Sequence, residues 1–131
     1  VDTGSYYPTV DTLGSHITGY TVGRAFYEHM GDRVRVWGTI TITSTASTTL
    51  TDPSFGLSLP PAYPSTFSDD ESLAGSGSQR LFNDVKAISV WTGYFVSPTD
   101  KAWVQYTKTA STSYSCKIRY SYDYIIQESA E

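Results

Sequence analysis

The residues best suited to metal or nucleophilic chemistry in this sequence are His16, His29 and a single cysteine, Cys116. A zinc site needs three or four nitrogen, sulfur or carboxylate ligands that converge on one point. His16 falls in a Gly-rich stretch and His29 near the end of an expected strand, with no second His or Cys at ligand spacing. Cys116 is in register with Ile118 and Tyr120 on an apolar strand face, which predicts a buried, inert thiol. We therefore expect no metal, no cofactor and no thiol chemistry.

The acidic residues and the serines form no catalytic pattern. Asp69-Asp70-Glu71 is the densest acidic group, but it lacks the spacing of a calcium loop and is typical of a solvated loop. Gly75-Ser76-Gly77-Ser78 lacks the spacing, and the following helix, of a hydrolase nucleophile elbow. A glycosidase needs two carboxylates across a cleft, whereas the other candidate acids fall on different elements: Glu28, Asp84, Asp100 and Asp123. We therefore expect a protein that is not an enzyme.

The aromatic residues are better candidates for function, because Tyr and Trp bury much area at an interface and keep a polar group. The chain has eleven Tyr and three Trp. The expected interface residues lie on strand faces: Trp37, Trp103, Tyr120, Tyr122 and Tyr124. The alternative is that these rings pack inside the chain. Trp91 and Tyr63 are the expected ligand or receptor contacts, because loops carry them.

The elements that must position these residues are β-strands. Alternation with a period of two predicts one strand over Arg33 to Thr43 and another over Cys116 to Gln127. Gly31-Asp32 predicts a tight hairpin between residues 24–30 and the first of these strands. Shorter strands are expected at 54–59, 73–77, 85–90, 92–96 and 101–106, with an extended segment at 5–10. Ser97-Pro98-Thr99-Asp100 predicts a turn that pairs 92–96 with 99–106.

Length and composition indicate one domain over residues 1–131. Apolar residues make up 39% of the chain and charged residues 17%, with a net charge of −4 and no basic patch. We therefore expect no nucleic-acid partner, and no apolar run is long enough for membrane insertion. The start shows no signal peptide. The predicted fold class is all-β, an antiparallel two-sheet β-sandwich of jelly-roll type. A single closed barrel is the alternative.

Several motifs, in order, resemble a recurrent module of virion proteins from tailed bacteriophages. They are Thr3-Gly4-Ser5-Tyr6-Tyr7-Pro8-Thr9, the segment from Phe26 to Ile40 with Arg33-Val34-Arg35-Val36-Trp37-Gly38-Thr39-Ile40, Gly56-Leu57-Ser58-Leu59-Pro60, Leu73-Ala74-Gly75 and Tyr120-Ser121-Tyr122-Asp123-Tyr124. Residues 79–101 match only loosely, and Met30-Gly31-Asp32 replaces the Val-Gly-Asn turn common in the module. The resemblance implies a non-enzymatic β-sandwich that assembles as a homotrimer.

Within that resemblance, the length of the chain favours a capsid decoration (cement) protein over a fibre subunit with a shaft. Such a protein would lie on the capsid surface of the virion and bridge subunits of the major capsid protein. The alternative is a receptor-binding domain of a tail fibre that recognises a host surface glycan or another receptor. A third hypothesis is an unrelated carbohydrate-binding module or glycan-cleaving enzyme.

Overall fold

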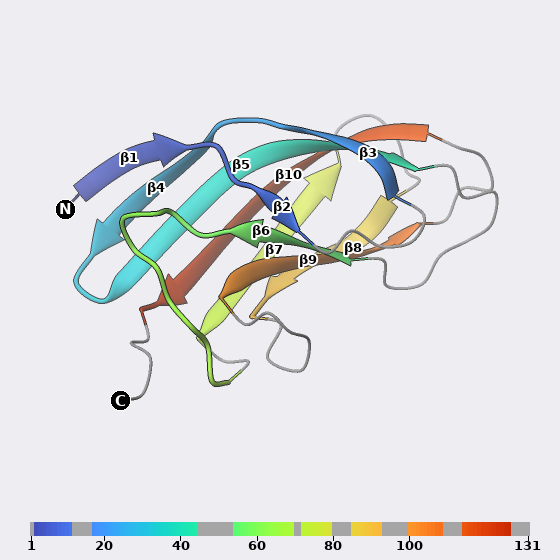
Figure 1. The fold of residues 1–131 in the computed structure, drawn as a ribbon. Helices are drawn as coiled ribbons and strands as arrows, with labels where there is room; N and C mark the ends of the chain where they lie inside the picture. The colour runs from blue at the N-terminus through green and yellow to red at the C-terminus, as the bar shows by residue number, and fades with distance from the viewer. Residues whose placement is uncertain are drawn as a thin grey trace.

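The described part of the chain consists of β-strands joined by turns and loops (Figure 1). The computed structural model describes residues 2–11, 17–44, 54–69, 72–79, 85–92, 100–108 and 114–126, and none of these is helical. The strands are β1 (Asp2–Tyr6), β2 (Val10–Asp11), β3 (Ile17–Val22), β4 (Ala25–Met30), β5 (Arg33–Ser44), β6 (Ser54–Ser58), β7 (Leu73–Gln79), β8 (Val85–Trp91), β9 (Lys101–Lys108) and β10 (Tyr114–Ile125).

These strands form one antiparallel sheet with the order β1-β4-β5-β10-β7-β8-β9-β6-β2, and β3 also pairs with β5. The sheet is strongly curled, so that its two halves enclose one interior (Figure 1). The all-β, antiparallel part of the prediction is confirmed. The hydrogen-bonded path is continuous, so the described strands do not divide into two separately bonded sheets.

The two long strands and the hairpin lie where the alternation predicts them. β5 and β10 pair over their whole length, from Tyr114 opposite Ser44 to Ile125 opposite Arg33. The hairpin between β4 and β5 turns at Gly31, whose φ of 64° is the left-handed conformation that glycine adopts without strain. The expected Gly31-Asp32 turn is therefore confirmed.

The strand β3 was not predicted. Gly19 interrupts its pattern, and its pairing with β5 shifts register between Ile17 and Gly19, so no regular alternation marks it. The expected strand at 92–96 and the turn at 97–100 lie largely outside the described residues. β9 pairs with β8 on one side and with β6 on the other.

The N-terminal segment occupies both edges of the sheet. β1 pairs with β4 at one edge, and β2 pairs with β6 at the other. Between them, the Thr9 amide donates to Ser58 Oγ (2.8 Å) and the Ser58 amide donates to the Thr9 carbonyl (3.0 Å). Pro8 is buried and donates no hydrogen bond, so it suits the crossing from one edge to the other.

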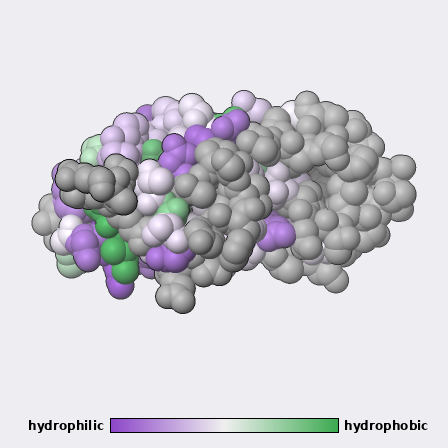
Figure 2. Space-filling model, turned by 60° about the horizontal axis from the view of Figure 1, so that its bottom comes forward, coloured by the Kyte–Doolittle hydropathy of each residue, from purple (hydrophilic) through white to green (hydrophobic). Residues whose placement is uncertain are grey.

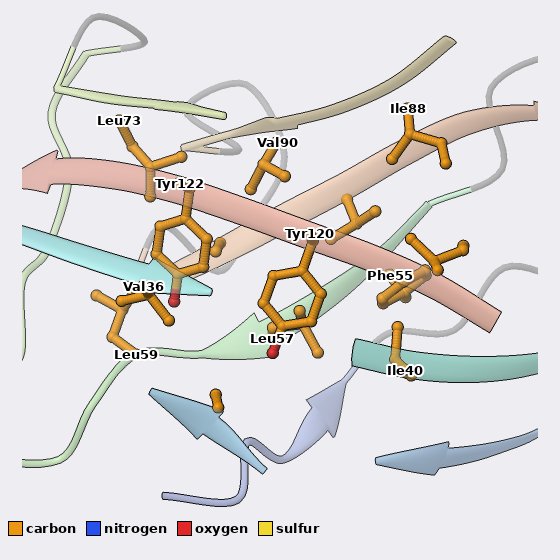
Figure 3. Packing of buried hydrophobic residues seen from close by; sticks show 14 of the residues in the cluster. Val36, Ile40, Phe55, Leu57, Leu59, Leu73, Ile88, Val90, Tyr120 and Tyr122 are labelled. Atoms are coloured by element: carbon orange, nitrogen blue, oxygen red, sulfur yellow. The ribbon is translucent and has the colours of Figure 1, made fainter. Parts of the chain in front are cut away.

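The interior is built around the tyrosines of β10 (Figure 3). Tyr120 lies opposite Gly38 of β5 and Gly77 of β7, and Tyr122 lies opposite Gly75. A Cβ atom at Gly38 would lie 2.8 Å from the Tyr120 hydroxyl, and one at Gly75 would lie 2.5 Å from Tyr122 Cβ. The glycines therefore leave the space that the neighbouring tyrosines occupy, a pairing known to support aromatic residues in sheets.

Hydroxyl contacts join this row of tyrosines to the N-terminal segment. Tyr6 Oη donates to the Ser58 carbonyl (2.8 Å), which leaves Tyr122 Oη as the donor to Tyr6 Oη (3.3 Å). Tyr124 Oη donates to the Tyr63 carbonyl (2.6 Å). Burial raises the pKa of all four hydroxyls, those of Tyr6, Tyr120, Tyr122 and Tyr124, above the ordinary value of 10.0.

The Gly75→Ala substitution should destabilise the fold by about 2 kcal/mol or more, because the added methyl overlaps Tyr122 Cβ and the Ser121 carbonyl. Gly19→Ala is the matched control, since its Cβ would meet only Thr43 Cβ, at 3.8 Å. Urea unfolding of the two variants measures the difference. Equal unfolding free energies would show that the glycine–tyrosine packing is not required.

The protein should lose stability above pH 10.0, the unfolded pKa of tyrosine. The folded pKa values are raised, so the buried hydroxyls stabilise the fold fully below that pH and progressively less as pH rises toward the folded values. Each hydroxyl removes about 1.4 kcal/mol of unfolding free energy per pH unit in this window. Urea unfolding at increasing pH measures the slope. Tyr122→Phe should reduce this slope by the contribution of one hydroxyl, about 1.4 kcal/mol per pH unit. An unchanged slope would contradict the prediction.

Candidate functional site

The face of β4, β5, β10 and β7 that points away from the tyrosine interior, called here the outer face, carries three rows of side chains in cross-strand register. Read from the β4–β5 turn, the rows are Met30–Arg33–Ile125, Glu28–Arg35–Asp123 and Phe26–Trp37–Ser121. The first is mostly apolar, the second charged and the third mostly aromatic. Figure 2 shows a narrow apolar strip among hydrophilic residues at the end of the molecule where the β4–β5 hairpin lies.

Beyond the aromatic row, the outer face is hollowed into an open groove of about 500 Å³. Its lining comes from four strands and the residue before β4: Arg24, Phe26, Trp37, Gly38, Thr39, Ser76, Gly77, Ser78, Arg119, Tyr120 and Ser121. A second hollow of about 460 Å³ shares Thr39, Ser78 and Arg119 with the groove and adds Lys117. The two hollows therefore lie side by side, and together they are called here the depression.

The aromatic wall of the groove consists of Phe26 and Trp37. Their ring centroids are 6.2 Å apart with an interplanar angle of 24°, and 42% and 38% of these residues remain exposed. Near-parallel rings with one open side offer a flat apolar surface. This pair is therefore a platform on which the apolar side of a ligand can lie.

The charged residues that line the depression in the described part of the chain are Arg24, Lys117 and Arg119. No acidic residue lines either hollow in the described part of the chain. Arg24 lies over the Tyr7 ring, 5.7 Å from its centroid. By contrast, Arg35 in the neighbouring row is 3.9 Å from the Asp123 carboxylate. The depression is thus locally positive on a chain whose net charge is −4.

Among the residues predicted to form an interface, only Trp37 lies on the surface. Trp103 is 1% exposed and Tyr120, Tyr122 and Tyr124 are 1–2% exposed, so an interface role for these four is corrected. The tyrosines fill the curled interior, which was the alternative reading. Trp103 is buried although it faces away from Ala102 and Val104, so both faces of β9 are covered.

Tyr63, predicted as a ligand contact, makes several contacts within the chain. Its hydroxyl donates to Asp2 Oδ2, and this hydrogen bond raises the Tyr63 pKa to about 12. Its ring stacks on His29 with centroids 4.1 Å apart and meets Tyr27 edge-on. Tyr63 therefore ties a loop to β1 and β4, and it does not lie in the groove.

Trp91, the other predicted contact, ends β8 opposite Trp103 and is half-buried. Its indole Nε1 is buried, and no described residue accepts a hydrogen bond from it. Trp91 does not line the groove, so the structure does not bring it together with Trp37 or Tyr63.

Several of the candidate chemical residues cannot be placed. His16, Asp70, Glu71, Asp84 and the side chain of Cys116 lie outside what the structure describes. Asp69 Oδ1 accepts hydrogen bonds from the amide (3.0 Å) and hydroxyl (2.8 Å) of Ser72, a turn-stabilising role.

No group of three His, Cys, Asp or Glu side chains suited to a metal ion occurs in the described ranges. Within the same ranges there is no helix long and apolar enough to span a membrane. No family model, no curated protein and no solved structure matches the chain.

The groove residues Phe26, Arg24 and Arg119 were missed as functional candidates. Counting outward from the Gly31-Asp32 turn pairs Phe26 with Trp37, so the hairpin itself carried a signal for the aromatic pair. Arg119 comes into the groove only because β10 pairs with β5. No local pattern marks a pairing between strands so far apart in sequence.

The exposure difference between Trp37 and Trp103 can be tested by acrylamide quenching of tryptophan fluorescence. Trp37→Phe should lower the quenching constant, because it removes the more exposed of the two indoles. Trp103→Phe is the control and should not lower it, provided that circular dichroism shows the variant to be folded. Unchanged quenching in Trp37→Phe would mean that the aromatic wall is covered in solution.

Proposed function

We propose that the chain is a non-enzymatic structural protein of a tailed-bacteriophage particle, a decoration protein that trimerises and bridges capsid subunits. The positions of the module-like motifs support this. Gly4 of the first motif lies opposite Tyr27, and Gly75 lies opposite Tyr122 of the last motif. The motifs that resemble the phage module thus supply the glycines, the tyrosines and the N-terminal segment that hold this sheet together.

The finer fold belongs to the same proposal. We describe the two halves of the curled sheet, β1-β4-β5-β10-β7 and β8-β9-β6-β2, as the two layers of a jelly-roll-like sandwich. Their inner side chains share one core, with Tyr122 and Val36 from one half and Leu57 and Phe55 from the other (Figure 3). β7 and β8 connect the layers through only a short ladder, at Gly75–Val90 and Ser76–Ser89.

The observation that carries the docking role is the apolar row at the β4–β5 end of the outer face. Met30 is 57% exposed and Ile125 is 40% exposed, and both lie beside Arg33. Large apolar side chains grouped on a surface and bordered by charges are typical of protein interfaces. Docking on an assembled shell would bury this row and stabilise the shell by mass action, because the protein binds the assembled state selectively.

A second candidate function is receptor binding by a tail fibre, and the groove is the observation that favours it. An aromatic platform beside cationic and hydroxyl groups suits a small polar ligand such as part of a host surface glycan. The trimer is part of either proposal. Trp37 is the one surface-exposed residue among those predicted for an interface, and in this second candidate function it serves the groove instead.

Quantifying this protein against the major shell protein in purified particles separates the two functions. A decoration protein should be present in copy numbers comparable to those of the shell subunits. A few copies per particle would instead support the tail location, and absence from particles would contradict both.

Met30→Glu combined with Ile125→Glu should abolish binding to shells that lack the protein, because docking would bury two carboxylates that Arg33 alone cannot both neutralise. Co-sedimentation with the shells measures the binding. Tyr20→Glu, at another exposed apolar position on β3, is the matched control and should bind normally. Normal binding by the double variant would show that the apolar row is not the docking surface.

A further inference from the structure

We propose that the groove on the outer face binds a saccharide that carries a carboxylate, such as a uronic or sialic acid. The inference names a ligand class for the groove that favours the second candidate function, and it rests on the groove alone. Its failure would remove that support for receptor binding and would leave intact the docking role, which rests on the apolar row.

The floor of the groove lies inside the sheet and not at an edge. Gly38, Tyr120 and Gly77 are in register on the three neighbouring strands β5, β10 and β7. An extended peptide that binds a sheet does so through free backbone groups at an edge. The polar groups available here are the hydroxyls of Thr39, Ser76, Ser78 and Ser121, which suit a ligand rich in hydroxyls of its own.

The wall of the groove matches the other side of a sugar ring. A pyranose has an apolar side made of C–H groups, and such a side packs on an open aromatic surface. Phe26 and Trp37 provide that surface at one border of the hydroxyl floor. A ligand with one apolar side and many hydroxyls can pack on the rings and hydrogen-bond to the hydroxyls of the floor. A wholly apolar ligand would leave those hydroxyls without hydrogen-bond partners.

The charges specify the acidic group. Arg119 lines both hollows, Lys117 lies in the second, and neither has a carboxylate within ion-pair distance among the described residues. A guanidinium binds a carboxylate through two parallel hydrogen bonds. The position of Arg119 between the two hollows therefore places a carboxylate near the middle of a bound ligand. Each hollow, at about 500 and 460 Å³, falls within the roughly 300–1,000 Å³ that ligand sites commonly measure.

Single-stranded nucleic acid also combines negative charge with rings that stack on aromatic residues. The groove favours the saccharide, because nucleic acid needs a continuous cationic track for its phosphates and the chain as a whole is acidic. Nucleic acid is therefore retained as an outcome of the test.

The test titrates the full chain, by isothermal calorimetry, with digalacturonate, a glucuronate-containing disaccharide and sialyllactose. Neutral lactose and an oligo-dT strand are the comparison ligands. At least one acidic saccharide should bind, and its affinity should fall at high salt, because the charges that contribute lie at the surface. Arg119→Gln and Trp37→Ala should each weaken that binding about tenfold or more.

Arg33→Gln is the matched control, because it removes an exposed arginine of the same face outside the groove and should leave the affinity unchanged. Thermal unfolding of each variant verifies that the fold is intact. The proposal is overturned if no acidic saccharide binds at millimolar concentration, if lactose binds equally well, or if only the oligo-dT strand binds. It is also overturned if Arg119→Gln binds as the unaltered chain does, or if Arg33→Gln loses as much affinity.

Discussion

The rest of the structure depends on the packing of large tyrosine rings of β10 over glycines in the strands on either side of it. Tyr120 lies between Gly38 and Gly77, and Tyr122 lies beside Gly75. A curled sheet encloses a wide interior, and long aromatic side chains fill it where aliphatic ones would leave cavities. Gly38 leaves the room that the hydroxyl end of Tyr120 occupies, and Gly75 lets β7 approach the backbone of β10 at Tyr122. Tyr6 and Tyr124 extend the same arrangement through their hydroxyls, to Ser58 and to the loop of Tyr63. Strand pairing, core filling and the attachment of the N-terminal segment thus share one set of contacts.

The candidate site is the reverse side of that arrangement. Successive residues of a strand point to opposite faces, so every tyrosine of β10 that points inward is followed by a residue that points outward. The outward residues that line the groove on β7 and β10 include the small side chains of Ser76, Ser78 and Ser121. On β10, the large inward residues Tyr120 and Tyr122 therefore lie beside a small outward one. The groove does not require a loop of particular conformation, and the most rigidly paired part of the sheet holds its residues.

Alternation predicts which residues share a strand face, but it does not reveal what covers each face. This is why β5, β10 and the β4–β5 hairpin were located correctly while the roles of several aromatic residues were not. Trp103 and Tyr120 looked suited to a subunit interface, because the sequence contains no sign that the sheet curls over one face of β10 and that both faces of β9 are buried. Trp37 was identified because its strand has one exposed face. Its partner Phe26 could have been found by counting residues outward from the β4–β5 turn. The position of Arg119 in the groove depends on the pairing of β10 with β5, a long-range pairing that has no local signal. β3 escaped because Gly19 and a register shift break its pattern.

The position of the N-terminal segment at both sheet edges has a consequence for the order of events during synthesis. β1 leaves the ribosome before the other strands of the sheet, its partner β4 follows later, β6 pairs with β2 later still, and the contact between Tyr6 and Tyr122 spans 116 residues. The earliest strand of the sheet is therefore among the last to gain all its contacts. Until β10 has emerged, the nascent chain has an open interior and unpaired edges, which is the condition under which β-proteins associate wrongly or recruit chaperones. A sheet completed by its own first residues folds late, and slow translation or a tethered N-terminus would prolong that exposed state.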